Sequence, residues 1–144
     1  MKKSTKFIIA LLVTVGALAI TYRVVNQAPS KDLAADAQMQ EIITSGGCLQ
    51  CHSGSPDLPF YANWPVASGM VQKDVTQGYR AFDMTEMAEA LKAGKPVGKV
   101  ALAKVEKVIM DGTMPKHAYY MVHWGSSVTD AKKEMAMAWV KQHR

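Results

Sequence analysis

At 144 residues, 49% of them hydrophobic and 20% charged, the chain is long enough for one folded domain with a modest core and an additional apolar segment. The formal net charge of +5 does not indicate a nucleic-acid-binding protein. Four of the 17 basic residues fall in the first 23 positions, which leaves 13 against 12 acidic residues in the rest of the chain. No basic cluster with interleaved aromatic residues is present in the sequence.

Residues 1–25 are predicted to be an export segment. The run from Phe7 to Tyr22 carries no charged side chain, Arg23 ends it, and apolar residues follow up to Val25. Three lysines precede this run, namely Lys2, Lys3 and Lys6. A positively charged end followed by such an apolar run is typical of a secretory signal peptide or of a signal anchor.

We favour an uncleaved anchor over a cleaved signal peptide, which would leave a soluble periplasmic product. Ala17-Leu18-Ala19 resembles a cleavage site, but the apolar run continues past it, and about 17 or more apolar residues can cross a thin bilayer. In both cases the positive-inside rule keeps the lysines in the cytoplasm. This orientation places the remainder of the chain in the periplasm. Residues 26–30, a short polar stretch that contains Pro29, are predicted to be a linker, and residues 31–144 a periplasmic domain held at the inner membrane.

The first helix of this domain is expected to begin after a cap at Ser30 or Asp32 and to run to about Thr44. Gly46-Gly47 would end it. This helix leads directly into the most informative motif of the sequence.

That motif is Cys48-Leu49-Gln50-Cys51-His52, which has the spacing of a c-type haem attachment site. Two thiols separated by two residues can reach the two vinyl groups at one edge of a porphyrin, while the adjacent imidazole reaches the iron. Cys48 and Cys51 are therefore predicted to carry one haem c through thioether bonds, with His52 as the proximal iron ligand.

Two other uses of the cysteines stay open. A C-x-x-C redox pair or disulfide is expected beside a βαβ pattern, and the sequence shows none. A zinc site would need two further ligands, for which only His117, His123 and His143 offer nitrogen.

Residues 53–65 contain three prolines and are expected to form a loop. If this loop passes under the proximal face, a backbone carbonyl, which we expect to be that of Pro59, accepts the second ring proton of His52. Its aromatic side chains would cover the porphyrin edge or belong to the core; they are Phe60, Tyr61 and Trp64.

Four more helices are predicted from apolar spacing and from start and stop signals, over residues 66–79, 85–93 and 99–110, and from Thr129 or Asp130 to about residue 142. No convincing strand pattern is present. The expected fold is all-α, a small class I-like cytochrome c domain of about four to five helices around one haem, preceded by the N-terminal membrane helix.

Met114 is the leading candidate for the distal iron ligand. It follows a helix in the turn Gly112-Thr113-Met114-Pro115, and ligation by a thioether raises the reduction potential relative to a second histidine. Three nearby side chains compete with it, namely Met121, His117 and His123, and an open distal site is a further alternative. Most of the ten methionines are expected to fill gaps in the core or to lie at the surface.

Several stretches together resemble the bacterial haem-binding domain family, most of all the amino-terminal haem domain of membrane-anchored tri-haem cytochrome c peroxidases, which act as quinol peroxidases. The stretches are Leu58–Tyr61, Gln72–Arg80, Ala103–Pro115, Tyr120–Thr129 and Ala138–Val140, and the likeness extends from about Gly46 to Arg144. Carried over by position, the resemblance implies haem attachment at Cys48 and Cys51, His52 as the proximal ligand and Met114 as the distal ligand.

The resemblance also implies a function. Those peroxidases continue into a di-haem module that performs the peroxide chemistry, whereas this sequence has a single CxxCH motif. We therefore expect an electron carrier rather than an enzyme, without catalytic residues, that takes electrons from quinol or a quinol-oxidising complex. Its acceptor would be a periplasmic protein such as a di-haem peroxidase. A haem-based gas or redox sensor with an open or displaceable distal site is the alternative.

Overall fold

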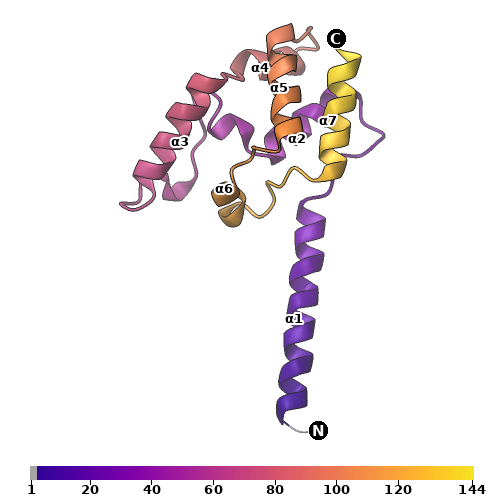
Figure 1. The fold of residues 1–144 in the computed structure, drawn as a ribbon, viewed down its shortest axis with the longest axis vertical. Coiled ribbons are helices and arrows are strands. Elements are labelled where there is room, and N and C mark those ends of the chain that lie inside the picture. Colours follow the sequence, from indigo (N-terminus) through magenta and orange to yellow (C-terminus); the bar gives the residue numbers. More distant parts are fainter. Residues whose placement is uncertain (1–2) are drawn as a thin grey trace.

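The computed structural model describes residues 3–144, so Lys2 of the predicted positive end lies outside the described residues. Within this range the chain is helical and contains no strand, which confirms the all-α prediction. Helix α1 (Lys3–Val25) projects from a domain formed by the remaining elements (Figure 1). These elements are α2 (Ala35–Ser45), η1 (Cys48–Gln50), η2 (Phe60–Asn63), α3 (Ser68–Ala81), α4 (Thr85–Lys92), α5 (Lys99–Asp111), α6 (His117–Val122) and α7 (Asp130–Gln142).

Most predicted helices lie within about two residues of their expected bounds, but the start of the first helix was predicted wrongly. Helix α2 begins at Ala35, and Ala34 occupies the N-cap position without a side-chain hydrogen bond. Ser30 instead accepts a hydrogen bond from the Asp32 amide at 3.2 Å, so these two residues form a local turn before the helix. At α7 the expected cap is present, because the Thr129 side chain accepts from the Lys132 amide.

The described part of the domain contains one more helix than expected. Helix α6 has only six residues and lies where no helix was predicted. The loop expected over residues 53–65 holds the short 3-10 turn η2. Isolated helices of this length are unstable, because the conformational entropy lost in nucleation exceeds the stabilisation from one turn of hydrogen bonds. Packing within the fold therefore stabilises these elements.

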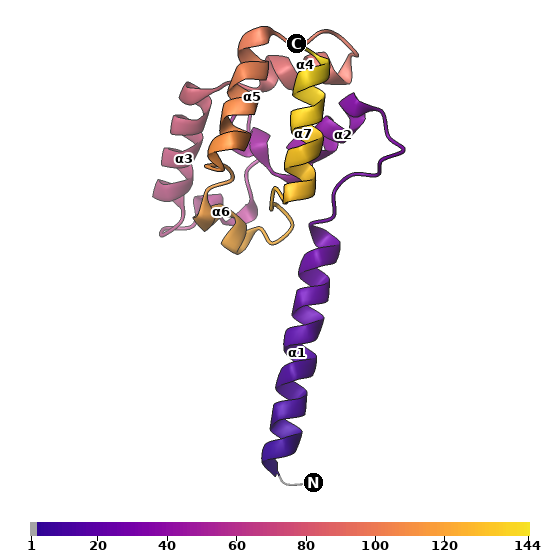
Figure 2. The same ribbon diagram turned by 45° about the vertical axis from the view of Figure 1, so that its right-hand side comes forward.

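The core lies between α2, α4, α5 and α7. Trp139 and Val140 on α7 are fully buried, and they pack in one cluster with Met39 and Ile43 of α2 and Leu102 of α5. The Trp139 indole donates a hydrogen bond to the Asp36 carboxylate at 2.7 Å, which satisfies its one polar atom. This cluster leaves α3 and α6 at the other side of the domain (Figure 2).

Helix α1 has the length and composition of a membrane span. Its 23 residues extend about 35 Å at 1.5 Å per residue, which exceeds the roughly 30 Å of a bilayer core. The segment Ser4–Val25 has a mean hydropathy of 2.2, and none of it is buried against the domain. An apolar surface on all sides of an exposed helix has no stable partner in water, so this helix could anchor the chain in a membrane.

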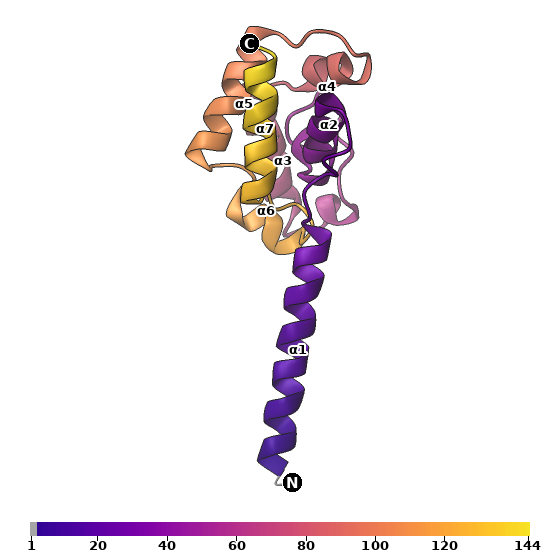
Figure 3. The same cartoon turned by 90° about the vertical axis from the view of Figure 1, so that its right-hand side faces the viewer.

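The junction between α1 and the domain is fixed by Asn26, which is 2% exposed. Its amide nitrogen donates to the carbonyl of Tyr22 at 3.0 Å and to that of Trp124 at 2.7 Å. Its side-chain oxygen accepts from the Ser127 amide at 2.9 Å. The Tyr22 hydroxyl also bonds with the Ser127 hydroxyl at 2.8 Å, so the segment before α7 is attached to the end of α1 (Figure 3).

Candidate haem-binding site

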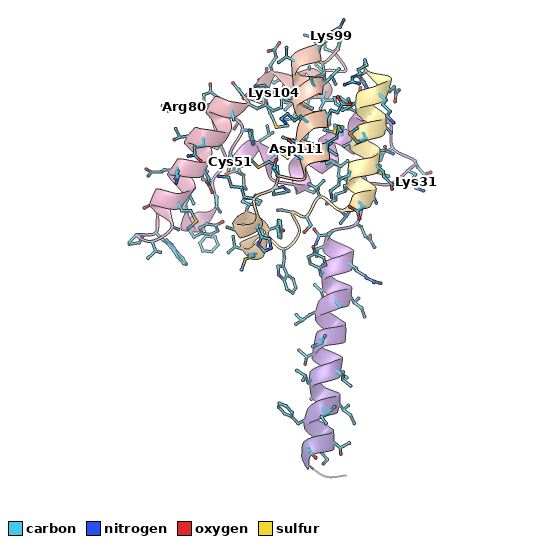
Figure 4. The ribbon with its side chains drawn as sticks, in the orientation of Figure 1. Lys31, Cys51, Arg80, Lys99, Lys104 and Asp111 are labelled. Carbon is cyan, nitrogen blue, oxygen red and sulfur yellow. The ribbon has the colours of Figure 1, made fainter. Side chains whose placement is uncertain are left out.

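A cavity of about 470 Å³ opens between α2, α3, α5 and the turn after α5. Most of its lining is apolar, contributed by the buried faces of α2 and α5 and by Phe82 and Met84. The side chains of Cys48, Cys51 and His52 line this cavity, and Met114 lines it as well. Figure 4 labels Cys51 between α3 and α5, and Asp111 at the end of α5; both residues line the cavity.

The motif reaches the cavity through a tight turn at the end of α2. Gly47 adopts a left-handed conformation with φ of 66°, and a side chain there would collide with the hydroxyl of Tyr119, so glycine is required on both grounds. The next residues form η1, and the His52 amide donates to the Cys48 carbonyl at 3.0 Å. The turn thus directs both thiols and the imidazole into one cavity.

Helix α3 closes the same region through Gly78. A Cβ atom at this position would lie 2.4 Å from the carbonyl oxygen of Cys51, far inside van der Waals contact. Only glycine lets the helix backbone approach the motif this closely.

The tautomer of His52 is set by a hydrogen bond of 2.8 Å between its Nδ1 and the carbonyl oxygen of Phe82. A carbonyl only accepts, so Nδ1 carries the proton and Nε2 keeps a free lone pair for a metal. The Phe82 ring also contacts the imidazole edge-on, with ring centroids 6.3 Å apart. A histidine held in this way is oriented as metal-ligating histidines commonly are.

The expectation that Pro59 supplies this carbonyl was wrong. The Pro59 carbonyl accepts from the Ala62 amide at 2.9 Å and closes η2 instead. The short extended segment between α3 and α4 lies beside the imidazole. In this segment the Met84 amide donates to the His52 carbonyl at 2.7 Å. These two hydrogen bonds join His52 to a segment some 30 residues away, which no local sequence signal indicated.

The structure separates Met114 from its competitors. Gly112 ends α5 in a left-handed conformation, with φ of 61°, and the following turn brings Met114 to the cavity wall, where its side chain is 37% exposed. Met121, His117 and His123 do not line this cavity. His143 lies at the end of α7, with its ring tilted against Trp139 and 2.9 Å from the Asp36 carboxylate.

Both cysteines are free thiols, and their surroundings disfavour the thiolate. Burial raises the pKa of Cys48 from 9.0 to about 11. Burial, with the charge of Asp74 as a smaller contribution, also raises the pKa of Cys51. Among the described residues no group of three or more histidine, cysteine or carboxylate side chains could hold a metal ion, so the zinc alternative finds no ligand set there.

The cavity rim is more cationic than anionic. Four lysines, at positions 104, 107, 116 and 133, line the cavity together with two aspartates, Asp74 and Asp111. Lys116 pairs with Asp74 at 2.6 Å and Lys107 with Asp111 at 2.8 Å. An apolar interior with a net positive rim suits a flat apolar group that carries carboxylates at its edge.

A polar cluster that the sequence did not reveal lies beside the motif. Tyr119 of α6 donates to the side-chain oxygen of Gln50, between the two cysteines, at 2.6 Å. His123 stacks on Tyr119 with ring centroids 4.0 Å apart, and its Nε2 lies 3.0 Å from the Tyr61 hydroxyl. The cluster therefore connects η2 and α6 to the attachment motif.

Two thiols, an imidazole and a thioether lining one apolar cavity are typical of a haem protein. The chain belongs to the haem-binding domain family, whose model matches residues 7–142. It is also similar to the cytochrome c peroxidase Ccp of Escherichia coli (strain K12), with 36% identity over 98 residues. That match covers 68% of this chain but 21% of the peroxidase, so the chain spans about a fifth of its relative's length. No solved structure matches.

The family match and the similarity to a cytochrome c peroxidase indicate a haem-based electron-transfer role.

Proposed function

We propose that this protein is a membrane-anchored mono-haem c-type cytochrome that transfers single electrons on the periplasmic side of the inner membrane. One observation carries the proposal: Cys48, Cys51, His52 and Met114 line one apolar cavity, in which the His52 tautomer leaves Nε2 free. In this arrangement Cys48 and Cys51 form the two thioether bonds. His52 and Met114 are the proximal and distal iron ligands.

Each residue has a defined physical role in electron transfer. The Phe82 carbonyl holds the imidazole in one orientation, which limits movement of this ligand between the two oxidation states. The same hydrogen bond increases the basicity of the imidazole. The thioether of Met114 favours the ferrous state more than a second imidazole does. The apolar wall from α2 and α5 excludes water and so reduces the solvent reorganisation that accompanies a change of charge. Bound haem supplies the redox-active iron.

The similarity to a cytochrome c peroxidase supports a proposal for the electron partners. We propose that the donor is quinol or a quinol-oxidising complex, since α1 would keep the domain at the membrane. The acceptor is a periplasmic protein such as a cytochrome c peroxidase. No residues of this chain are assigned to peroxide chemistry.

A haem-based gas or redox sensor is the second candidate. The observation that favours it is the exposure of Met114, which lies on a turn after α5 rather than within a packed helix. A ligand held only by such a turn can be displaced by a small molecule at modest cost.

The visible spectrum of the ferrous protein, recorded before and after carbon monoxide on material made with haem maturation, separates the two candidates. A low-spin spectrum that carbon monoxide leaves unchanged supports a closed electron carrier. A prompt shift supports the sensor. A preparation whose haem is removed by acid-acetone extraction contradicts covalent attachment and overturns both.

A further inference from the structure

Two stretches of the domain lack charged residues and expose large apolar side chains. None of the Lys, Arg, Asp or Glu residues falls within residues 58–72 or 117–129. A third charge-free run, residues 42–56, contains the Cys48–His52 motif and exposes no large apolar side chain. In the first stretch Phe60 is 82% and Val66 92% exposed, and Trp64 is also exposed. In the second stretch Met121, Val122 and Trp124 are exposed. We call these six residues the apolar end surface.

Aromatic contacts join this surface to the end of α1. Tyr22 of α1 meets Trp124 edge-on, with ring centroids 6.2 Å apart. Next to Trp124 along the chain, His123 contacts Tyr61 at 5.8 Å. Phe60 then contacts both Tyr61 and Trp64, each at 5.5 Å. Together with the peptide bond between His123 and Trp124, these ring contacts connect the proposed membrane span to η2.

The apolar end surface also lies at the end of the domain that would be closest to the bilayer. Figures 1, 2 and 3 differ by rotation about the vertical axis, and in each view α6 and the chain before α3 lie at the end of the domain from which α1 leaves. Lys99, at the start of α5, is at the far end (Figure 4). The hydrogen bonds of Asn26 hold this orientation.

We propose that the apolar end surface rests in the headgroup region of the phospholipid bilayer, so that the domain lies on the membrane in one orientation. The inference rests on the proposed anchoring by α1. Exposed tryptophan and apolar side chains without neighbouring charges suit the interface between water and hydrocarbon. The span and the bonds of the Asn26 side chain already hold this surface beside the lipid. Contact of the surface with the bilayer therefore costs little additional orientational freedom of the domain.

The test uses fluorine NMR of the full-length, reduced holoprotein labelled with 5-fluorotryptophan, in nanodiscs that contain a gadolinium-chelating lipid. Identical nanodiscs with lutetium provide the diamagnetic reference. Trp139 is 2% exposed in the core and serves as the internal control. We expect the Trp64 and Trp124 signals to be broadened severalfold more than that of Trp139. The Trp64 signal is the diagnostic one. The contact of Trp124 with Tyr22 of α1 would by itself place Trp124 near lipid, even if the rest of the surface stayed in water.

A double variant, Phe60→Ser with Val66→Ser, removes apolar area from the surface without touching the core. We expect it to lose most of the broadening of Trp64 while that of Trp124 persists. The matched control is Val100→Ser, because Val100 is 72% exposed at the far end of the domain. It should leave Trp64 broadened.

Co-elution of the chain with nanodiscs distinguishes failure of the proposed anchoring from failure of the proposed surface contact. A chain that does not co-elute overturns the anchoring, and the inference with it. A chain that co-elutes while Trp64 stays as sharp as Trp139 overturns the inference alone. Persistent broadening of Trp64 in the double variant also overturns it.

Discussion

Replacing Asn26 by alanine would weaken the attachment of the segment before α7 to the end of α1, leaving the bond between the Tyr22 and Ser127 hydroxyls. Two of the Asn26 hydrogen bonds cross this junction, one to the Trp124 carbonyl at 2.7 Å and one from the Ser127 amide at 2.9 Å. The bond to Tyr22 lies at the end of α1 itself and does not hold the two parts together. At about 1 kcal/mol for each crossing bond, the variant loses about 2 kcal/mol of local stability. This corresponds to an increase of about 30-fold in the opening equilibrium of the junction.

Amide-resolved hydrogen–deuterium exchange measures this opening, because the Ser127 amide is itself the donor of one lost bond. We expect its exchange in Asn26→Ala to be about 30-fold faster, with core amides of α7 unchanged. Gln27→Ala is the matched control, since Gln27 is exposed and its side chain forms no hydrogen bond of this kind. Unchanged exchange at Ser127, or equal acceleration through α7, would refute the reasoning.

Four further predictions concern the haem site. Met114→Ala should open the sixth position, so that carbon monoxide binds promptly and the reduction potential falls by a part of the roughly 0.8 V that axial ligands span. In the haem-free Cys51→Ser chain, alkylation of Cys48 at pH 8 should be about 100-fold slower than in urea, because burial raises its pKa from 9.0 to about 11. This folded apo chain should also lose stability as pH rises from 9 to 11, since its thiol holds the proton more tightly than the unfolded chain does. Gly78→Ala should lower the free energy of unfolding by about 1–3 kcal/mol, because its Cβ meets the Cys51 carbonyl at 2.4 Å.

Each of these has a control in the same chain. Met121→Ala should leave the potential and the spectrum nearly unchanged, and the reverse pattern would move the distal ligand to Met121. Gly69→Ala on the same helix as Gly78 meets no atom within 4 Å, so it should stabilise the fold by up to about 1 kcal/mol. Equal thermal denaturation of the two glycine variants contradicts the close approach of α3. An alkylation rate that titrates near pH 9 in the folded chain contradicts the burial of Cys48.

Short stretches of sequence determine the local features of this protein. The Cys48–His52 motif needs only its own spacing, and the apolar run to Tyr22 needs only its length. Helices α5 and α7 were placed from apolar periodicity and from end signals such as Thr129, because those signals act within a few residues.

Tertiary packing decided what surrounds these features. Nothing near Phe82 marks its carbonyl as the partner of His52, because any backbone carbonyl can accept and only the path of the chain between α3 and α4 selects this one. Helix α6 and the turn η2 are too short to form alone, so they exist through contacts such as that between Tyr61 and His123. The orientation of the domain on α1 likewise depends on hydrogen bonds between Asn26 and residues about 100 positions away. Sequence determines the CxxCH motif, the apolar run and the long helices because their causes are local, whereas folding decides the partner of the imidazole and the orientation of the domain on α1 because their causes are distant in the chain.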